Sequence, residues 1–281
     1  MLPRLHEVPF LAPEGFVRLA YVEWGAPRGP TVVCAHGLTR NARDFDALAA
    51  QLAAQGRRVV CVDFPGRGRS QWLSRATDYG YPVYLTALAT LLARLDVASV
   101  DWIGTSMGGL AGMLLAAQSG GPIRRLVVND VGPFIPKASL ERIATYVGQT
   151  MTFPSLRAVE HHLRVVAAPF GPLTDAQWRH LAAHSARPDG DVWRLRYDPA
   201  IALPFTAAPI ADVDLWPVWD RIAAPTLVLR GAESDLLLAE TAAEMTTRGP
   251  RATVVDVPGC GHAPALMDAS QIEPIVGFLD A

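Results

Sequence analysis

The chain has few of the features that mark secreted, membrane or nucleic-acid-binding proteins. Only three of its 281 residues are cysteine, namely Cys34, Cys61 and Cys260. An odd count, with two of the three inside expected core strands, favours free thiols in a reducing compartment over a disulfide framework. The N-terminus lacks the basic start and the apolar core of a signal peptide. We therefore expect a soluble cytoplasmic protein.

Long hydrophobic runs and a strong net charge are missing as well. The apolar stretch 85–95 is interrupted by Thr86, Thr90 and Arg94, so it is not a membrane span. The net charge is only −2, and no basic stripe predicts nucleic-acid binding. What is present is a chain that is 50% hydrophobic, which suits strands buried on both faces. Its length fits one large α/β domain or two small domains.

Strand-like and helix-like segments alternate along the first half of the chain. Alternating or continuous apolar runs predict strands at 5–10, 16–24, 31–35, 58–63 and 97–103, whereas apolar residues at helical spacing predict helices at 44–55 and 84–95. Such alternation predicts parallel strands joined by right-handed crossovers.

The alternation stops after Val131 and resumes near Trp216. Between them lie helical stretches and many prolines, with no convincing strand. We interpret 134–214 as a helical cap inserted after the sixth strand, and 1–133 with 215–281 as the core domain. Ligands bind at the carboxyl ends of parallel strands, so the cap is expected to cover the site. Its aromatic residues, Trp193 among them, line the pocket or build the core of the cap itself.

A serine between glycines follows the apolar strand 100–103. The segment Gly104-Thr105-Ser106-Met107-Gly108 then leads into a leucine-rich helix. This strand–turn–helix context is that of a nucleophile elbow, in which small flanking residues permit a strained turn that exposes the serine hydroxyl.

A serine nucleophile needs a base and a carboxylate that orients the base. His262 lies in a glycine-flanked loop after the strand 253–257 and is the predicted base. Asp235, which follows the strand and turn 225–231, is the predicted carboxylate, and Glu233 and Asp130 are its rivals. The chain order serine, acid, histidine is the one expected for such an elbow.

The loop after the strand 31–35 completes the predicted site. Backbone N–H groups of Leu38 and Met107 are expected to hold a developing oxyanion, at roughly 3–4 kcal/mol per donor. His36, Gly37 and Arg40 border the substrate site, with His36 expected to hold the loop rather than transfer protons. Arg40 either recognises a polar or carboxylate-bearing substrate or forms a cap-to-core salt bridge.

Taken together, these motifs resemble the α/β-hydrolase superfamily, in its branch of small serine hydrolases with a helical cap. The matching segments, in the family's order, are 36–37, 63–70, 104–109, 231–235 and 259–262. The resemblance implies a mostly parallel eight-stranded sheet flanked by helices and acyl-enzyme chemistry with no cofactor or metal. Dehalogenases and epoxide hydrolases of the superfamily carry an aspartate at the elbow, where this chain has Ser106.

The predicted function is hydrolysis of a small, partly apolar carboxylic ester by a monomer or homodimer. C–C bond hydrolysis of a dienoate or opening of an enol-lactone is the enzymatic alternative, and an arginine projecting from the cap into the pocket would favour it. Arg164, Arg194 and Arg196 are the candidates. A binding protein without activity is the alternative of another class.

Overall fold

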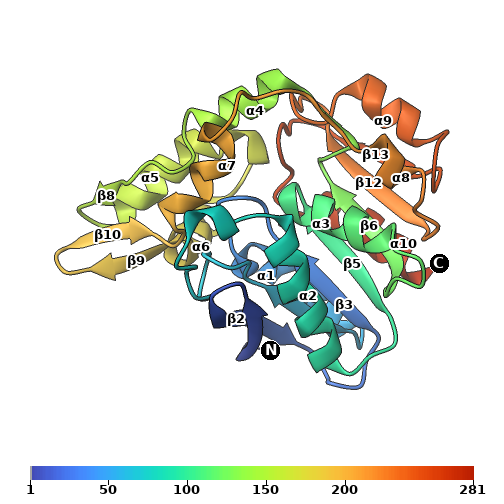
Figure 1. Cartoon of the computed structure of the whole chain (residues 1–281), viewed down its shortest axis with the longest axis horizontal. Coiled ribbons are helices and arrows are strands. Elements are labelled where there is room, and N and C mark those ends of the chain that lie inside the picture. Colours follow the sequence, from blue (N-terminus) through green and yellow to red (C-terminus); the bar gives the residue numbers. More distant parts are fainter. Residues whose placement is uncertain (1) are drawn as a thin grey trace.

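A computed structural model describes residues 2–281 of the chain. Eight strands form the central sheet: β1 (Arg4–Ala12), β2 (Gly15–Trp24), β3 (Thr31–Ala35), β4 (Arg58–Val62), β5 (Val100–Thr105), β6 (Ile123–Asn129), β12 (Thr226–Gly231) and β13 (Thr253–Val257). Their order is β1-β2-β4-β3-β5-β6-β12-β13 (Figure 1). Only the pairs β1–β2 and β2–β4 are antiparallel. The predicted mostly parallel eight-stranded sheet is confirmed.

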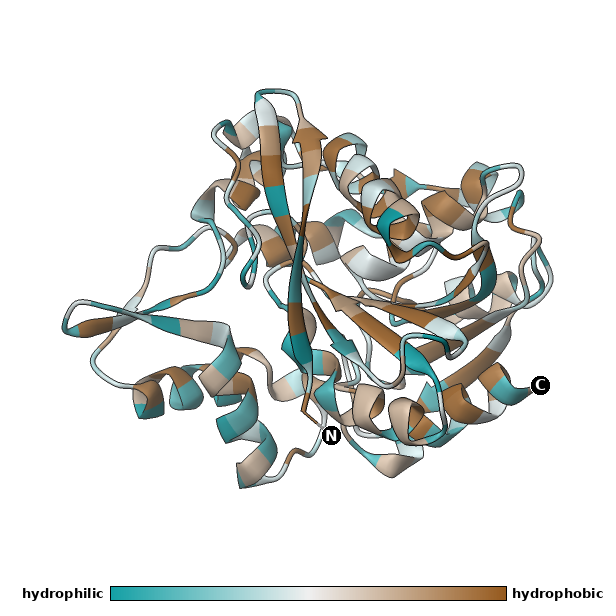
Figure 2. Ribbon diagram, turned by 90° about the horizontal axis from the view of Figure 1, so that it is seen from below, coloured by the Kyte–Doolittle hydropathy of each residue, from teal (hydrophilic) through white to brown (hydrophobic). Residues whose placement is uncertain are grey.

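Helices cover both faces of this sheet because its central strands are apolar on both sides. One face packs against α2 (Tyr81–Leu95), α3 (Met107–Ala116), α8 (Trp216–Trp219) and α9 (Ala239–Met245). The other packs against α1 (Asp46–Ala54) and α10 (Ala269–Asp280). In Figure 2 the strands are largely hydrophobic and the helices carry both hydrophobic and hydrophilic residues. Burial of each large apolar side chain stabilises this arrangement by about 1.5–3 kcal/mol.

The strand register brings several loops to one edge of the sheet. Gly104 at the end of β5 pairs with Ala35 of β3 and with Val128 of β6. Leu229 of β12 pairs with Asn129 of β6, and Gly231 pairs with Val257 of β13. The loops that follow β3, β5, β6, β12 and β13 therefore converge, as expected at the carboxyl ends of parallel strands.

The chain leaves this edge after β6 and returns to the core at α8. Two short strands, β7 (Phe134–Ile135) and β11 (Val213–Asp214), pair antiparallel where it leaves and returns. Between them lie α4 (Lys137–Ala144), α5 (Leu156–Val166), α6 (Asp175–Ser185) and α7 (Leu203–Thr206). We call the segment 134–214 the cap; its division from the core at these residues stays a prediction.

The cap also contains a sheet that the sequence did not indicate. Its strands are β8 (Thr152–Phe153), β9 (Ala186–Asp189) and β10 (Val192–Leu195), in the antiparallel order β8-β10-β9. The expectation of no strand in the cap is therefore wrong. Strands of two to four residues, one of them containing a proline, are too short to show an alternating pattern. In Figure 1 the β9–β10 hairpin projects away from the core.

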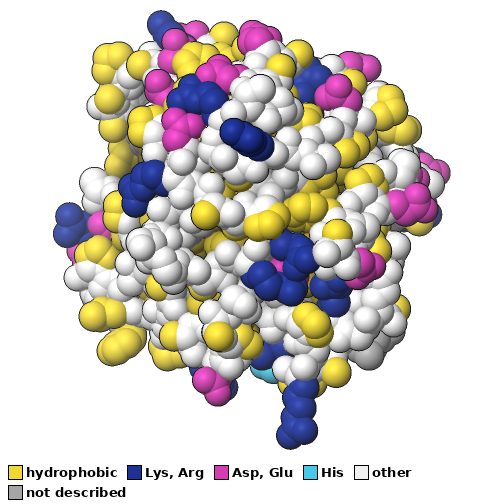
Figure 3. All heavy atoms as spheres, turned by 90° about the vertical axis from the view of Figure 1, so that its right-hand side faces the viewer, with side chains coloured by type: hydrophobic (Ala, Val, Ile, Leu, Met, Phe, Trp, Pro, Cys, Tyr) yellow, Lys and Arg dark blue, Asp and Glu magenta, His cyan; other side chains and the backbone are white. Residues whose placement is uncertain are grey.

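Short 3₁₀ helices complete the structure: η1 (Ala42–Phe45), η2 (Ala76–Asp78), η3 (Ala168–Phe170) and η4 (Pro199–Ala202). Within residues 2–281, no helix combines the length and the hydropathy that crossing a membrane requires. On the face of the molecule shown in Figure 3, basic and acidic side chains lie interspersed, and no continuous basic stripe crosses it.

Candidate active site

Ser106 lies on a sharp turn between β5 and α3. Its backbone angles are φ 52° and ψ −117°, a conformation that costs a non-glycine residue on the order of 1–3 kcal/mol. A Cβ at Gly104 would lie 2.2 Å from the Gly108 carbonyl oxygen, and one at Gly108 would lie 2.0 Å from the Ala35 carbonyl oxygen. Glycine at both positions lets α3 approach β5 and β3 this closely. The turn has the geometry of a nucleophile elbow.

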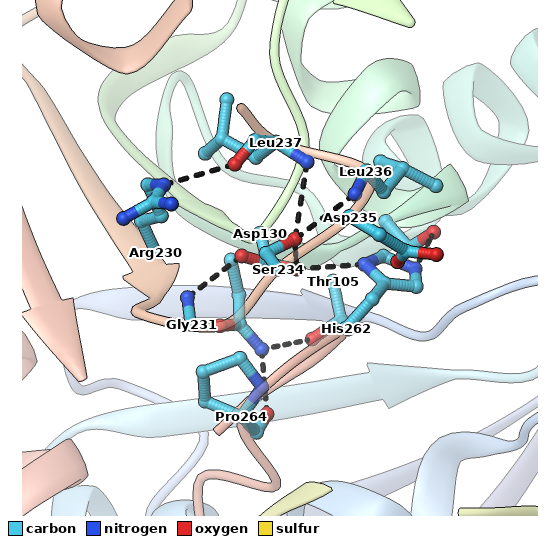
Figure 4. A network of polar contacts seen from close by, with 12 residues as sticks. Thr105, Asp130, Arg230, Gly231, Ser234, Asp235, Leu236, Leu237, His262 and Pro264 are labelled. Atoms are coloured by element: carbon cyan, nitrogen blue, oxygen red, sulfur yellow. Dashed lines mark hydrogen bonds and ion pairs between the residues drawn. The ribbon is translucent and has the colours of Figure 1, made fainter. Parts of the chain in front are cut away.

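His262 lies in the loop between β13 and α10 and contacts two of the other candidates. Its Nε2 is 3.0 Å from Ser106 Oγ, and its Nδ1 is 2.8 Å from Asp130 Oδ2. Figure 4 shows the contact with Asp130. A carboxylate on Nδ1 favours the neutral tautomer that carries its proton there, which leaves the Nε2 lone pair facing the serine hydroxyl.

The Asp130 carboxylate is fully buried and held by two further donors. Oδ2 also accepts a hydrogen bond of 2.7 Å from Ser234 Oγ, and Oδ1 accepts one of 2.7 Å from the Gly231 amide. Both donors belong to the end of β12 and the turn after it, as Figure 4 shows. A buried carboxylate is expensive unless its oxygens accept hydrogen bonds, and this one has three donors: His262 Nδ1, Ser234 Oγ and the Gly231 amide.

The structure corrects the predicted carboxylate, because Asp235 does not contact His262. Its side chain is half exposed and accepts hydrogen bonds from Arg142 of α4, at 2.5 Å from Nε and 2.9 Å from Nη2. Its carbonyl oxygen accepts a bond from Ser139 Oγ. Asp235 therefore ties the cap helix α4 to the loop after β12. Glu233 is exposed, and its amide donates to the Cys260 carbonyl oxygen.

The error has a simple structural origin. β6 and β12 are neighbours in the sheet, so Asp130 and Asp235, which follow them, both emerge at the same edge. Each also satisfies the chain order serine, acid, histidine. What separates them is the partner of each side chain, since Asp130 contacts His262 and Asp235 pairs with Arg142 of the cap helix α4.

The peptide between Gly37 and Leu38 is fixed on its carbonyl side. The Gly37 oxygen lies 2.7 Å from His36 Nδ1 and accepts a bond from the Arg40 amide. The N–H of a trans peptide points opposite its carbonyl, so the Leu38 N–H is directed away from both donors. Among residues 2–281, neither this N–H nor that of Met107, the first residue of α3, donates to another group.

His36 holds this loop in its neutral form. Its Nε2 accepts a hydrogen bond of 3.0 Å from the Phe64 amide, so Nδ1 is the ring nitrogen that donates to Gly37. Complete burial, opposed by the Gly37 contact and aided by the nearby Arg67 and Arg40 charges, lowers the pKa of His36 to about 3. His36 thus holds the loop, and it also lines the small hollow beside Thr105.

A hollow of about 30 Å³ lies beside Thr105, lined by the core residues Gly37 and Arg40 and by the cap residues Phe170 and Leu181. This volume holds about two water molecules, which is too little for an ester substrate. Arg40 forms a two-pronged pair with Asp44 at 2.7 and 2.8 Å, and its guanidinium lies 5.6 Å from the Phe170 ring centre.

Trp193 does not line this hollow. It lies in β10, paired with Phe153 and Pro188, and packs partly buried against the apolar cluster of the cap. The alternative that cap aromatic residues build the cap's own core therefore describes the packing of Trp193, and its contact with a substrate stays a prediction.

One group among residues 2–281 brings three possible metal ligands together: Asp46, His180 and His184, whose ligand atoms lie within 4.8 Å of one another. Asp46 is already bound by the Arg43 guanidinium at 2.8 and 2.9 Å. Burial and the charges of Arg43 and other neighbours lower the pKa of His184 to about 4. Such cationic surroundings oppose a metal ion, and the group is a contact between α6 and α1.

Comparisons with known proteins agree with the observed fold. The alpha/beta hydrolase fold family matches residues 30–269. The 3-hydroxybutyrate-oligomer hydrolase of Cupriavidus necator is 47% identical over 280 residues, which cover 96% of this chain and 95% of that protein. Esterase Rv0045c of Mycobacterium tuberculosis is 30% identical over 236 residues, 82% of this chain and 75% of that protein.

Among solved structures, an alpha/beta hydrolase from Novosphingobium aromaticivorans has a TM-score of 0.88 and 37% sequence identity. The comparison covers 100% of this chain and 99% of that chain. The similarity therefore extends over the cap as well as the central sheet.

Proposed function

Because the chain belongs to the α/β-hydrolase superfamily, we propose that it is a serine esterase that hydrolyses short oligomers of 3-hydroxybutyrate or a similar hydroxy acid. The observation that carries the proposal is the contact series from Ser106 through His262 to the buried Asp130. The relative at 47% identity supports the substrate class, since oligomers of a hydroxy acid are linear esters.

In this mechanism His262 Nε2 takes the proton of Ser106 as Oγ attacks the ester carbonyl. Asp130 holds the imidazole by Nδ1–H and stabilises the charge that forms on it. The Leu38 and Met107 amides donate hydrogen bonds to the oxyanion. Each of these bonds stabilises the transition state by roughly 3–4 kcal/mol. The alcohol leaves with the proton from His262. Water activated by His262 then releases the acid from the acyl-enzyme.

The C–C hydrolase alternative receives no support from the cap arginines. Arg164 pairs with Glu160 and Asp175, and Arg194 pairs with Asp189. Arg196 donates to the Ala186 carbonyl oxygen. None of these three arginines lines the hollow beside Thr105. The cap therefore supplies no arginine there that would bind the carboxylate of a dienoate.

The substrate class is tested by comparing purified dimer, trimer and tetramer of 3-hydroxybutyrate with p-nitrophenyl butyrate and a meta-cleavage dienoate. We expect monomer release from the oligomers, with kcat/KM at least tenfold above that for the dienoate. Chromatography of the released acids gives the rates. Faster turnover of the dienoate, or oligomers left intact while p-nitrophenyl butyrate is cleaved, contradicts the oligomer assignment.

Ser234 is a positioning residue in this mechanism, because its hydroxyl donates to the carboxylate that orients His262. A hydrogen bond to a charged group contributes about 1.5–3 kcal/mol. We therefore expect Ser234→Ala to lower kcat/KM roughly 10- to 100-fold. Ser234→Thr, which keeps the hydroxyl, is the matched control and should retain most of the rate. Equal losses in both variants would show that packing of the turn, and not the hydroxyl, matters.

We also propose a cytoplasmic location, as monomer or homodimer, with a small-molecule ester as the partner. The three cysteines are buried and free of disulfides, which suits a reducing compartment.

A further inference from the structure

A second hollow, of about 390 Å³, opens where the cap meets the β1 side of the core. Arg187 of β9 and Arg196 after β10 line it from the cap, and Arg69 and Trp72 line it from the loop after β4. The Gly68 amide donates to the Arg196 carbonyl oxygen at 2.8 Å, so the two walls are joined by a backbone hydrogen bond. Ser106, Asp130 and His262 do not line this hollow.

Three guanidinium groups share this space with a single carboxylate. Glu7 is that carboxylate; its side chain is 46% exposed and lies 3.7 Å from Arg18. Among residues 2–281, Arg69, Arg187 and Arg196 form no ion pair with any carboxylate, whereas Arg164, Arg194 and Arg248 each do. The three charges therefore share the hollow without a carboxylate of the described chain in direct contact with any of them.

Arg196 is partly buried beside the other two arginines. Burial first, and then the charges of Arg69 and Arg187, lower the pKa of its guanidinium, while Asp63 acts in the opposite direction. Asp63 is itself buried and already accepts hydrogen bonds from two backbone amides. An anion in the hollow would relieve this repulsion with donors that suit a carboxylate geometrically.

The walls also offer apolar surface beside the charges. The Arg187 guanidinium lies 5.8 Å from the Trp72 ring centre, and Trp72 is 41% exposed. Leu5, 48% exposed, lines the same hollow. Charge beside exposed apolar side chains suits an anion with a hydrocarbon stem better than inorganic phosphate.

We propose that the hollow formed by Arg69, Arg187, Arg196 and Trp72 binds an aliphatic carboxylate. During catalysis, this carboxylate is the free acid end of the hydroxy-acid oligomer that the enzyme hydrolyses. That identification rests on the proposed function; binding of an aliphatic carboxylate does not.

The test measures hexanoate binding to the wild-type chain by calorimetry at low ionic strength, with hexanol and inorganic phosphate as comparison ligands. Hexanoate should bind more tightly than either, and added NaCl should weaken it. The Arg69→Gln/Arg187→Gln double variant should bind at least tenfold more weakly, and Trp72→Ala about threefold more weakly. Arg157→Gln, an exposed arginine of α5 outside the hollow, is the matched control and should not differ from wild type.

Wild-type affinity in the double variant, or no hexanoate binding to the wild type, overturns the proposal. If phosphate or hexanol binds as tightly as hexanoate, the hollow does not select a ligand that has both a carboxylate and a hydrocarbon stem, and this part of the proposal is overturned. A second arm compares kcat/KM for the trimer and for its methyl ester. The preference for the free acid should fall in the double variant, whose hydrolysis of p-nitrophenyl butyrate stays unchanged. An unchanged preference contradicts the chain-end assignment, and absence of any oligomer turnover contradicts the proposed function while the hexanoate result stands.

Discussion

Replacement of Ser106 by alanine is expected to lower kcat for p-nitrophenyl butyrate roughly 10⁴-fold or more while the chain keeps its fold. The hydroxyl contacts His262 Nε2, and the Ser106 amide donates to the Asn129 carbonyl oxygen, a bond that alanine preserves. The variant therefore loses the nucleophile without losing the backbone contact of the elbow. Steady-state rates, with the melting temperature from circular dichroism, measure both parts of the prediction.

The control is Ser74→Ala, which removes an exposed hydroxyl far from the elbow in sequence and should leave the rate unchanged. A Ser106→Ala enzyme with a tenth of the wild-type rate would rule out Ser106 as the nucleophile. Residual activity near 10⁻⁴ is compatible with the account, because oxyanion donors and substrate binding accelerate hydrolysis even without the serine.

Asp130→Asn is expected to lower kcat/KM roughly 10³- to 10⁴-fold. An amide at this position no longer stabilises the imidazolium, and its NH₂ group can hold the imidazole in the wrong tautomer. The substitution nearly conserves volume at a site where Gly231 and Ser234 donate to the carboxylate. A melting curve of the variant shows whether the rate is lost because the His262 imidazole is misoriented, which leaves the melting temperature unchanged, or because the protein unfolds.

Asp235→Asn is the matched comparison, because the same change is made at the rival position on the neighbouring strand end. Asp235 and Arg142 are both about half exposed, and an ion pair of this kind contributes about 0–1 kcal/mol. We expect a rate within about threefold of wild type. If Asp235→Asn abolished turnover and Asp130→Asn did not, the carboxylate assignment drawn from the structure would be wrong.

The elbow is the part of the site that sequence predicts best. Gly104, Ser106 and Gly108 are demanded by local geometry, because the strand, the turn and the helix that follow one another in sequence determine which side chains fit. The eight-stranded sheet follows from the same kind of local regularity, repeated along the chain. His262 is placed by its glycine-flanked loop near the end of the chain.

The carboxylate depends on long-range packing. Choosing between Asp130 and Asp235 requires knowing that β6 and β12 are adjacent and that Gly231 and Ser234 turn their donors toward Asp130. Neither fact is encoded in a local pattern. The packing of Trp193 could not be predicted for a related reason, since the direction of its side chain is set by a strand of four residues inside the cap.

The most direct test of Ser106 as the nucleophile is covalent labelling with a small fluorophosphonate, followed by mass spectrometry of the digested protein. We predict a single adduct on the peptide that contains Ser106, no adduct in Ser106→Ala, slow labelling of Asp130→Asn and wild-type labelling of Asp235→Asn. An adduct on a different residue, or equal labelling of the Ser106→Ala protein, would contradict the proposed mechanism.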